Sequence, residues 1–173
     1  ELYRKRSQPF ANISYTILGI VYASLPFTLF QHIAYNTKEI YSWQIVLGVL
    51  LMLWASDSGA YFAGRTLGKT KLFERISPKK TWEGSIGGLI LSLVFAFGIS
   101  VYWFDLNLWQ WAGMSVIIVV IGGYGDLVES LLKRSLDIKD SSNFLPGHGG
   151  FLDRFDGLLL ALPFLACFLI LTA

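Results

Sequence analysis

The sequence is short of charge, of cysteine and of histidine, and each shortage excludes a class of protein. Charged residues make up 15% of the 173 positions, against roughly a quarter in ordinary soluble domains, while hydrophobic residues make up 54%. The lone cysteine, Cys167, has no partner for an internal disulfide, which excludes a disulfide-stapled secreted fold. One cysteine and two distant histidines disfavour a zinc site. The net charge of +2 is too small to indicate a nucleic-acid partner.

The few charges are placed so that five long stretches contain none of them. A helix that crosses a bilayer core takes about 20 mainly apolar residues, with a range of about 17 to 25. The five stretches are 10–37, 40–56, 84–104, 106–125 and 157–173. Because they are continuously apolar rather than alternating, they indicate helices and not the strands of a membrane barrel. The sequence therefore predicts an all-α, polytopic transmembrane helix bundle of about five spanning helices, forming a single membrane domain over residues 1–173.

Basic residues gather on one side of this predicted bundle. Of the fourteen lysines and arginines, only Lys38 lies in a connection on the opposite side. Connections rich in positive charge stay in the cytoplasm, so the basic side is expected to be cytoplasmic. Two connections on that side, residues 64–83 and 132–156, are long and polar. We expect the function where these two segments meet the membrane.

The first polar segment follows a helix that carries an acidic residue. Asp57, Tyr61 and Arg65 recur at helical spacing and are expected on one helix face. An intramembrane acid is costly, so Asp57 should face a partner, a polar cavity or a cation. A structural pair between Asp57 and Arg65 or Lys69 is the simpler alternative.

The same segment contains the motif Ser77-Pro78-Lys79-Lys80. Serine before proline predicts a helix N-cap with the proline in the first turn. The positive end of that helix and the two lysines would then converge on a phosphate group. A basic loop that contacts anionic lipid headgroups explains the same charges, so both interpretations stay open.

The second polar segment begins on the fourth spanning helix. Its polar positions share about a third of the helix circumference, which predicts a water-filled cleft. These positions are Asp126, Glu129, Ser130, Lys133 and Arg134. A simple pair between Glu129 and Lys133, four residues apart, is the alternative.

The segment ends with two acids before the last span. Asp153 and Asp156 are three residues apart and would share one face of a helix that starts there. Carboxylates beside many cations suit Mg²⁺, which usually takes one or two carboxylates plus substrate phosphates. Favourable placement of acids at a helix N-terminus is the alternative without a metal. His148 is a candidate general acid or base, or a hydrogen-bonding residue of its glycine-rich loop.

These residues together resemble the signature of a known enzyme family. The matching run is Ser130-x-Leu132-Lys133-Arg134-x4-Lys139-Asp140-x-Ser142-x2-Leu145-Pro146-x-His148-Gly149-Gly150-Phe151-x-Asp153-Arg154-Phe155-Asp156. It is similar, position by position, to the signature of phosphatidate cytidylyltransferases, also called CDP-diacylglycerol synthases. Asp57 to Tyr61, Gly64-Arg65 and Ser77 to Gly84 resemble the family's other polar block. Because family members carry further N-terminal membrane helices, this chain is expected to be the C-terminal portion of a longer enzyme.

The resemblance implies a reaction and the residues that perform it. CTP and phosphatidate would give CDP-diacylglycerol and pyrophosphate for phospholipid synthesis, with Mg²⁺ as cofactor and a second metal or monovalent ion left open. The implied catalytic residues are Asp126, Asp153, Asp156 and Lys133, of which the three aspartates are the implied metal ligands. The implied substrate-binding residues are polar or charged: Asp57, Arg65, Ser77, Lys79, Lys80, Glu83, Arg134, Lys139, Asp140, His148 and Arg154. A homodimer in the bacterial inner membrane, with its active site facing the cytoplasm, is implied as well.

Two other readings of the sequence remain as alternatives. A CTP-dependent polyprenol or phytol kinase, or a CDP-archaeol synthase, would share the nucleotide and metal site but use another lipid acceptor. From a different class, Asp57 and Asp126 would line the pathway of an ion or solute transporter. Transporter sites usually lie near the bilayer midplane between related repeats, whereas no repeat is visible here and the charges gather on one face.

Overall fold

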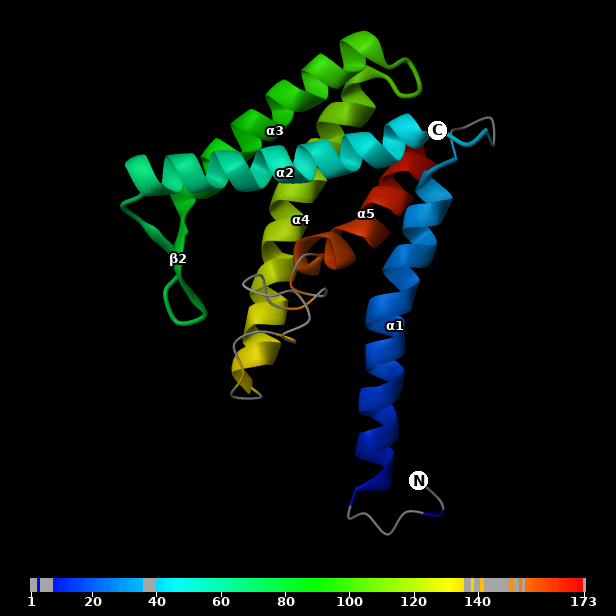
Figure 1. The fold of residues 1–173 in the computed structure, drawn as a ribbon, viewed down its shortest axis with the longest axis vertical. Helices are drawn as coiled ribbons and strands as arrows, with labels where there is room; N and C mark the ends of the chain where they lie inside the picture. The colour runs from blue at the N-terminus through cyan, green and yellow to red at the C-terminus, as the bar shows by residue number, and fades with distance from the viewer. Residues whose placement is uncertain are drawn as a thin grey trace.

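The computed structural model describes residues 3, 8–35, 40–135, 138, 141, 150, 153 and 155–172. Helices dominate this part of the chain, in the arrangement of Figure 1. They are α1 (Pro9–Ile33), α2 (Trp43–Thr66), α3 (Trp82–Tyr102), α4 (Leu108–Ser135) and α5 (Asp156–Thr172). Within the described ranges, α1 to α4 are long and apolar enough to cross a membrane, and α5, with 17 residues, is at the short end. The prediction of an all-α polytopic bundle is confirmed.

A small hairpin interrupts the helices between α2 and α3. Strands β1 (Lys71–Phe73) and β2 (Ser77–Thr81) pair antiparallel, with Lys71 opposite Thr81 and Phe73 opposite Ser77. The prediction that Ser77 caps a helix with Pro78 in its first turn is therefore wrong. Proline is tolerated here because a two-stranded sheet consists of edges, where a missing N–H costs no ladder bond. The Lys71 ammonium also donates to the Pro78 carbonyl at 2.6 Å, which ties the strands together.

The true cap of α3 is Thr81, the last residue of β2. Its side-chain oxygen accepts a hydrogen bond from the Gly84 N–H at 3.2 Å, which satisfies one free donor of the first helical turn. Glu83 adds a negative charge near the positive end of the helix. The helix thus starts four residues after Pro78, and both lysines of the motif stay on the strand.

Glycines allow α2 and α3 to lie side by side, as Figure 1 shows. A Cβ atom added at Gly59 would lie 2.6 Å from the carbonyl oxygen of Gly87, so no larger residue fits at this contact. Small residues at such positions let membrane helices approach closely. Polar bonds reinforce the packing: Ser92 on α3 donates to the Met52 carbonyl at 3.2 Å, and Ser115 on α4 donates to the Ser92 hydroxyl at 2.9 Å.

A second glycine contact joins α4 to α5. A Cβ at Gly125 would lie 2.9 Å from the Asp156 carbonyl, and one at Gly157 would lie 2.9 Å from the Gly122 carbonyl. This close approach places the first residue of α5 beside the Asp126 region of α4. In contrast, α1 packs mainly on α5, touches α2 only near its C-terminal end, and extends away from the other helices toward its N-terminus (Figure 1).

Candidate functional site

A pocket of about 310 Å³ opens where α2, α4 and the first residues of α3 and α5 come together. Three aspartates from three different helices line it: Asp57 on α2, Asp126 on α4 and Asp156 on α5. Lys79 and Lys80 of β2 contribute the cationic part of the wall. Residues from distant parts of the sequence thus line one small cavity, brought together by the hairpin, the cap of α3 and the glycine contact of α4 with α5. A cavity of this size with a few convergent polar groups has the usual form of a small-molecule site.

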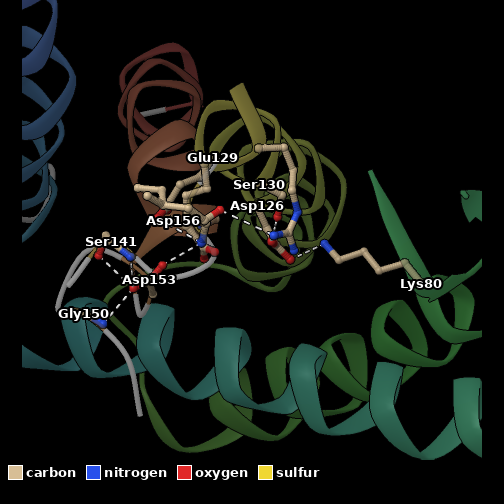
Figure 2. A network of polar contacts seen from close by, with 12 residues as sticks. Lys80, Asp126, Glu129, Ser130, Ser141, Gly150, Asp153 and Asp156 are labelled. Atoms are coloured by element: carbon tan, nitrogen blue, oxygen red, sulfur yellow. Dashed lines mark hydrogen bonds and ion pairs between the residues drawn. The ribbon is translucent and has the colours of Figure 1, made fainter. Parts of the chain in front are cut away.

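Asp126 is the centre of the acidic group. Its carboxylate forms an ion pair with the Lys80 ammonium and accepts a hydrogen bond from the Ser130 hydroxyl at 3.2 Å (Figure 2). The side chains of Lys80 and Asp126 are 28% and 35% exposed, so the pair contributes about 1 kcal/mol or less. A phosphate or a cation that enters the pocket can therefore separate them at small cost.

The other two aspartates line the same pocket as Asp126. Asp156 reaches it from across the contact of α4 with α5, and Asp57 reaches it from α2. The Asp156 carboxylate also accepts the N–H of Gly157 at 2.6 Å, which holds it at the start of α5. Three carboxylates thus face one recess together with the ammonium groups of Lys79 and Lys80, so the recess carries charges of both signs.

Asp153 does not line this pocket and is engaged elsewhere. Its carboxylate accepts hydrogen bonds from the Lys133 ammonium at 2.6 Å and from the Gly150 N–H at 2.7 Å. Ser141 donates both its N–H, at 3.0 Å, and its hydroxyl, at 2.7 Å (Figure 2). Burial raises the pKa of the Asp153 carboxyl, but the bonds from Lys133, Ser141 and Gly150 outweigh burial and hold the pKa below its usual range.

The prediction that Asp153 and Asp156 share a helix face is also wrong. Helix α5 begins at Asp156, and Asp153 lies before it. The carboxylates have different partners: Asp153 meets a cation and three neutral donors, whereas Asp156 accepts the N–H of Gly157. Asp153 therefore ties the segment before α5 to α4.

Glu129 is a buried acid that sequence reasoning left out of the candidate site. Its side chain is 1% exposed, and its Oε1 lies 3.3 Å from the Lys133 ammonium. This distance makes an ion pair, although neither Glu129 oxygen has hydrogen-bond geometry with any described partner. Lys133 thus lies between Glu129 and Asp153 and is bound more closely by Asp153. The spacing of four residues on the polar face of α4 was the signal for this pair.

The remaining predicted residues of the first polar segment have separate positions. Arg65 donates to the Tyr61 hydroxyl at 2.9 Å, and no ion pair joins it to Asp57 within the described ranges. Glu83 accepts the Thr70 N–H at 3.1 and 3.2 Å, which fixes the entry to the hairpin. Ser77 lies in β2 and does not line the pocket.

In the second segment, Arg134 is exposed and donates to the Ile138 carbonyl at 3.4 Å. Four predicted residues lie outside the described part of the chain: Lys139, Asp140, His148 and Arg154. Ser130, Ser141 and Gly150 were not predicted as site residues. Ser130 was indicated by the polar face of its helix, and Ser141 and Gly150 only by their places beside or in the matching run.

No ready-made metal site is formed by the residues that the structure describes. None of their His, Cys, Asp and Glu side chains form a group of three or more that could hold an ion by itself. The expected trio of Asp126, Asp153 and Asp156 is not gathered, since Asp153 binds Lys133 instead. The aspartates that do face one cavity are Asp57, Asp126 and Asp156.

Comparison with known proteins adds an independent finding. A family model described as the cytidylyltransferase family matches residues 1–172. The phosphatidate cytidylyltransferase of Haemophilus influenzae is 48% identical over 130 residues, which cover 72% of this chain and 45% of that protein. The proteins of the same name from Staphylococcus aureus (strain COL) and Bacillus subtilis (strain 168) are each 40% identical, over 93% of this chain and 60% of their own length. The chain thus spans roughly half of the length of these relatives.

Proposed function

Because this chain belongs to the cytidylyltransferase family, we propose that it transfers a cytidylyl group from CTP to phosphatidate. The products are CDP-diacylglycerol, a precursor for phospholipid synthesis, and pyrophosphate. The observation that carries the proposal is the pocket in which Asp57, Asp126 and Asp156 meet Lys79 and Lys80. A nucleoside triphosphate with its bound cation needs positive groups for its phosphates and negative groups for the cation, and this pocket supplies both.

The proposed reaction is an in-line displacement at the α-phosphorus of CTP. An oxygen of the lipid phosphate forms a bond to the α-phosphorus of CTP, while the bond from that phosphorus to the bridging oxygen breaks. Pyrophosphate leaves with the bonding electrons. A phosphate nucleophile is already ionised at neutral pH, so the reaction requires no general base. The protein's task is to bring two anions together and to neutralise them, which is where positioning and electrostatics lower the barrier most.

The described lysines fit this task in different ways. Lys79 and Lys80 would contact the triphosphate, and Lys80 can leave Asp126 because their ion pair is open to solvent. Lys133 is less mobile, since Asp153 and Glu129 hold it from two sides. Its catalytic role stays a prediction, since two carboxylates neutralise the ammonium group and Lys133 does not line the pocket.

The three pocket aspartates also fit a divalent cation such as Mg²⁺. They are oxygen ligands that face one cavity, and of the three only Asp126 forms an ion pair with a described lysine. They do not close a ligand shell, which suits an ion that takes one or two carboxylates and completes its shell with substrate phosphates. When bound, the ion would neutralise phosphate oxygens and stabilise the charge that grows on the leaving group. The prediction that Asp153 belongs to this ligand set requires its contact with Lys133 to open.

We further propose that the pocket faces the cytoplasm from the bacterial inner membrane. Lys79 and Lys80, which belong to the basic side expected in the cytoplasm, line the pocket, and CTP is a cytoplasmic substrate. Phosphatidate would enter from the surrounding lipid. A homodimer stays a prediction from the family resemblance.

The test is turnover of the full-length protein with labelled CTP, phosphatidate and Mg²⁺, followed by product analysis. CDP-diacylglycerol and pyrophosphate are expected in equal amounts, whereas a phosphorylated lipid with CDP would identify a lipid kinase. Asp126→Asn should lower kcat by two orders of magnitude or more, since it removes the central carboxylate. Asp105→Asn is the matched control, because Asp105 lies between α3 and α4 and lines none of the pockets described here. Equal activity of the two variants would refute the assignment of the site.

A further inference from the structure

A second, apolar cavity opens beside the polar pocket. It has a volume of about 320 Å³ and is formed by β1 and by the facing sides of α3 and α4. Phe73, Trp82, Ile86, Val120 and Tyr124 are among the residues that line it. Trp82 and Ile86 are each 54% exposed, although both begin a helix of membrane-spanning length. The apolar groove, as we call it, is therefore open on the outer surface of the described helices.

The apolar groove and the polar pocket share part of their walls. Leu72, Ser85, Val119 and Gly123 line both cavities. The polar pocket and the apolar groove are therefore adjacent, with these four residues as their common wall. The change from polar to apolar occurs over one turn of α4, between Asp126 and Gly123. This is the shape and polarity of an amphiphile that has an anionic head and a hydrocarbon tail.

We propose that the apolar groove holds an acyl chain of the phosphatidate whose phosphate reacts in the polar pocket. This inference rests on the proposed function and adds the position of the lipid substrate. A bilayer is as apolar as the groove, so the chain gains little binding energy when it moves from lipid into the groove. What the groove supplies is position, because a seated chain fixes the distance of the phosphate from the α-phosphorus of CTP.

Gly123 offers a way to close the groove without disturbing the fold. A Cβ added there meets no atom within 4 Å, so a side chain would extend into free space where the two cavities join. Gly98 on α3 provides a matched control. A Cβ there also meets nothing within 4 Å, and Gly98 lines a separate apolar cavity with Tyr102 and Trp103 near the other end of α3.

The experiment compares Gly123→Ala, Gly123→Val and Gly123→Phe with Gly98→Phe in the full-length protein, in vesicles that contain dioleoyl phosphatidate. We expect kcat/KM for phosphatidate to fall with the size of the side chain at position 123, by tenfold or more for phenylalanine. Displacement of a reacting group by about 1 Å costs up to about 100-fold, which sets the upper end. The KM for CTP should stay within about twofold, and Gly98→Phe should match the unmodified protein.

Two kinetic outcomes would overturn the inference. One is equal turnover of Gly123→Phe and Gly98→Phe, and the other is a parallel rise in the KM values of CTP and phosphatidate, which would place the added ring in the nucleotide site. Neither outcome touches the proposed function, since CDP-diacylglycerol is still formed. Absence of that product from the unmodified protein would refute the proposed function instead.

A second measurement tests the position of the acyl chain if the Gly123→Phe variant does not accumulate in the membrane. Phosphatidate with a photoreactive diazirine in its acyl chain is cross-linked to the unmodified protein. Labelling is expected within residues 82–89 and 119–127 and should be competed by unlabelled phosphatidate but not by phosphatidylcholine. Equal competition by both lipids would identify ordinary bilayer lipid, and labelling elsewhere would place the chain on another surface. Either result overturns the proposal.

Discussion

The contact between Lys133 and Asp153 is predicted to be the strongest polar link between α4 and the segment before α5. The distance is 2.6 Å, and the two side chains are only 14% and 11% exposed. Removal of one partner from a fully buried pair costs about 3–5 kcal/mol. Lys133 keeps Glu129 nearby and both groups retain some solvent, so we expect Asp153→Asn to lower the free energy of unfolding by about 2–3 kcal/mol.

A double-mutant cycle measures this interaction directly. Unfolding in mixed micelles, followed by tryptophan fluorescence, is compared for the unmodified protein, Lys133→Gln, Asp153→Asn and the double variant. Groups in direct contact should show a coupling energy of about 1–3 kcal/mol, whereas independent sites add within about 0.5 kcal/mol. Glu129→Gln combined with Lys133→Gln should couple less, because the distance is 3.3 Å without hydrogen-bond geometry. Additive effects of Lys133→Gln and Asp153→Asn would refute the described network.

Three further predictions follow from the packing and the charges. Gly59→Leu should lower the free energy of unfolding by about 3 kcal/mol or more in the same assay, because the Gly87 carbonyl leaves no space for a side chain and backbone atoms cannot move aside. Near-normal stability would contradict the close contact of α2 with α3. Thr81→Ala should cost about 1 kcal/mol through loss of the α3 cap, while Thr81→Ser should recover most of it; equal losses would argue against capping. The pKa of the Asp153 carboxyl is lowered in the folded protein, so the ionised carboxylate stabilises the fold fully above the pKa of the unfolded chain, about 4, and less as the pH falls below it. The difference in unfolding free energy between the unmodified protein and Asp153→Asn should therefore shrink only below about pH 4. A constant difference down to pH 2 would contradict that shift.

Much of the fold could be predicted from composition, because few backbone structures are stable inside a membrane. Long apolar runs without charge must satisfy their backbone groups internally, so they become helices. The boundaries of α2, α3 and α4 lie close to the predicted spans, and α2 and α4 carry Asp57 and Asp126 on their helices, as predicted. The hairpin was missed because Ser77 and Pro78 have strong local signals for a helix start, which strand pairing overrode.

The order of residues along the chain specifies which residue types are present for chemistry: acids at the ends of apolar helices, lysines between them, and a run similar to a known family. Which of these acids face one another depends on how the helices pack. Spacing along the chain predicts which residues of one helix share a face, as with Glu129 and Lys133, but it does not predict contacts between helices. The glycine contact between Gly125 and Asp156 places Asp156 with Asp126 and Asp57, and the donors around Asp153 turn that carboxylate toward Lys133. Packing, which depends on the shapes of several helices at once, made this selection.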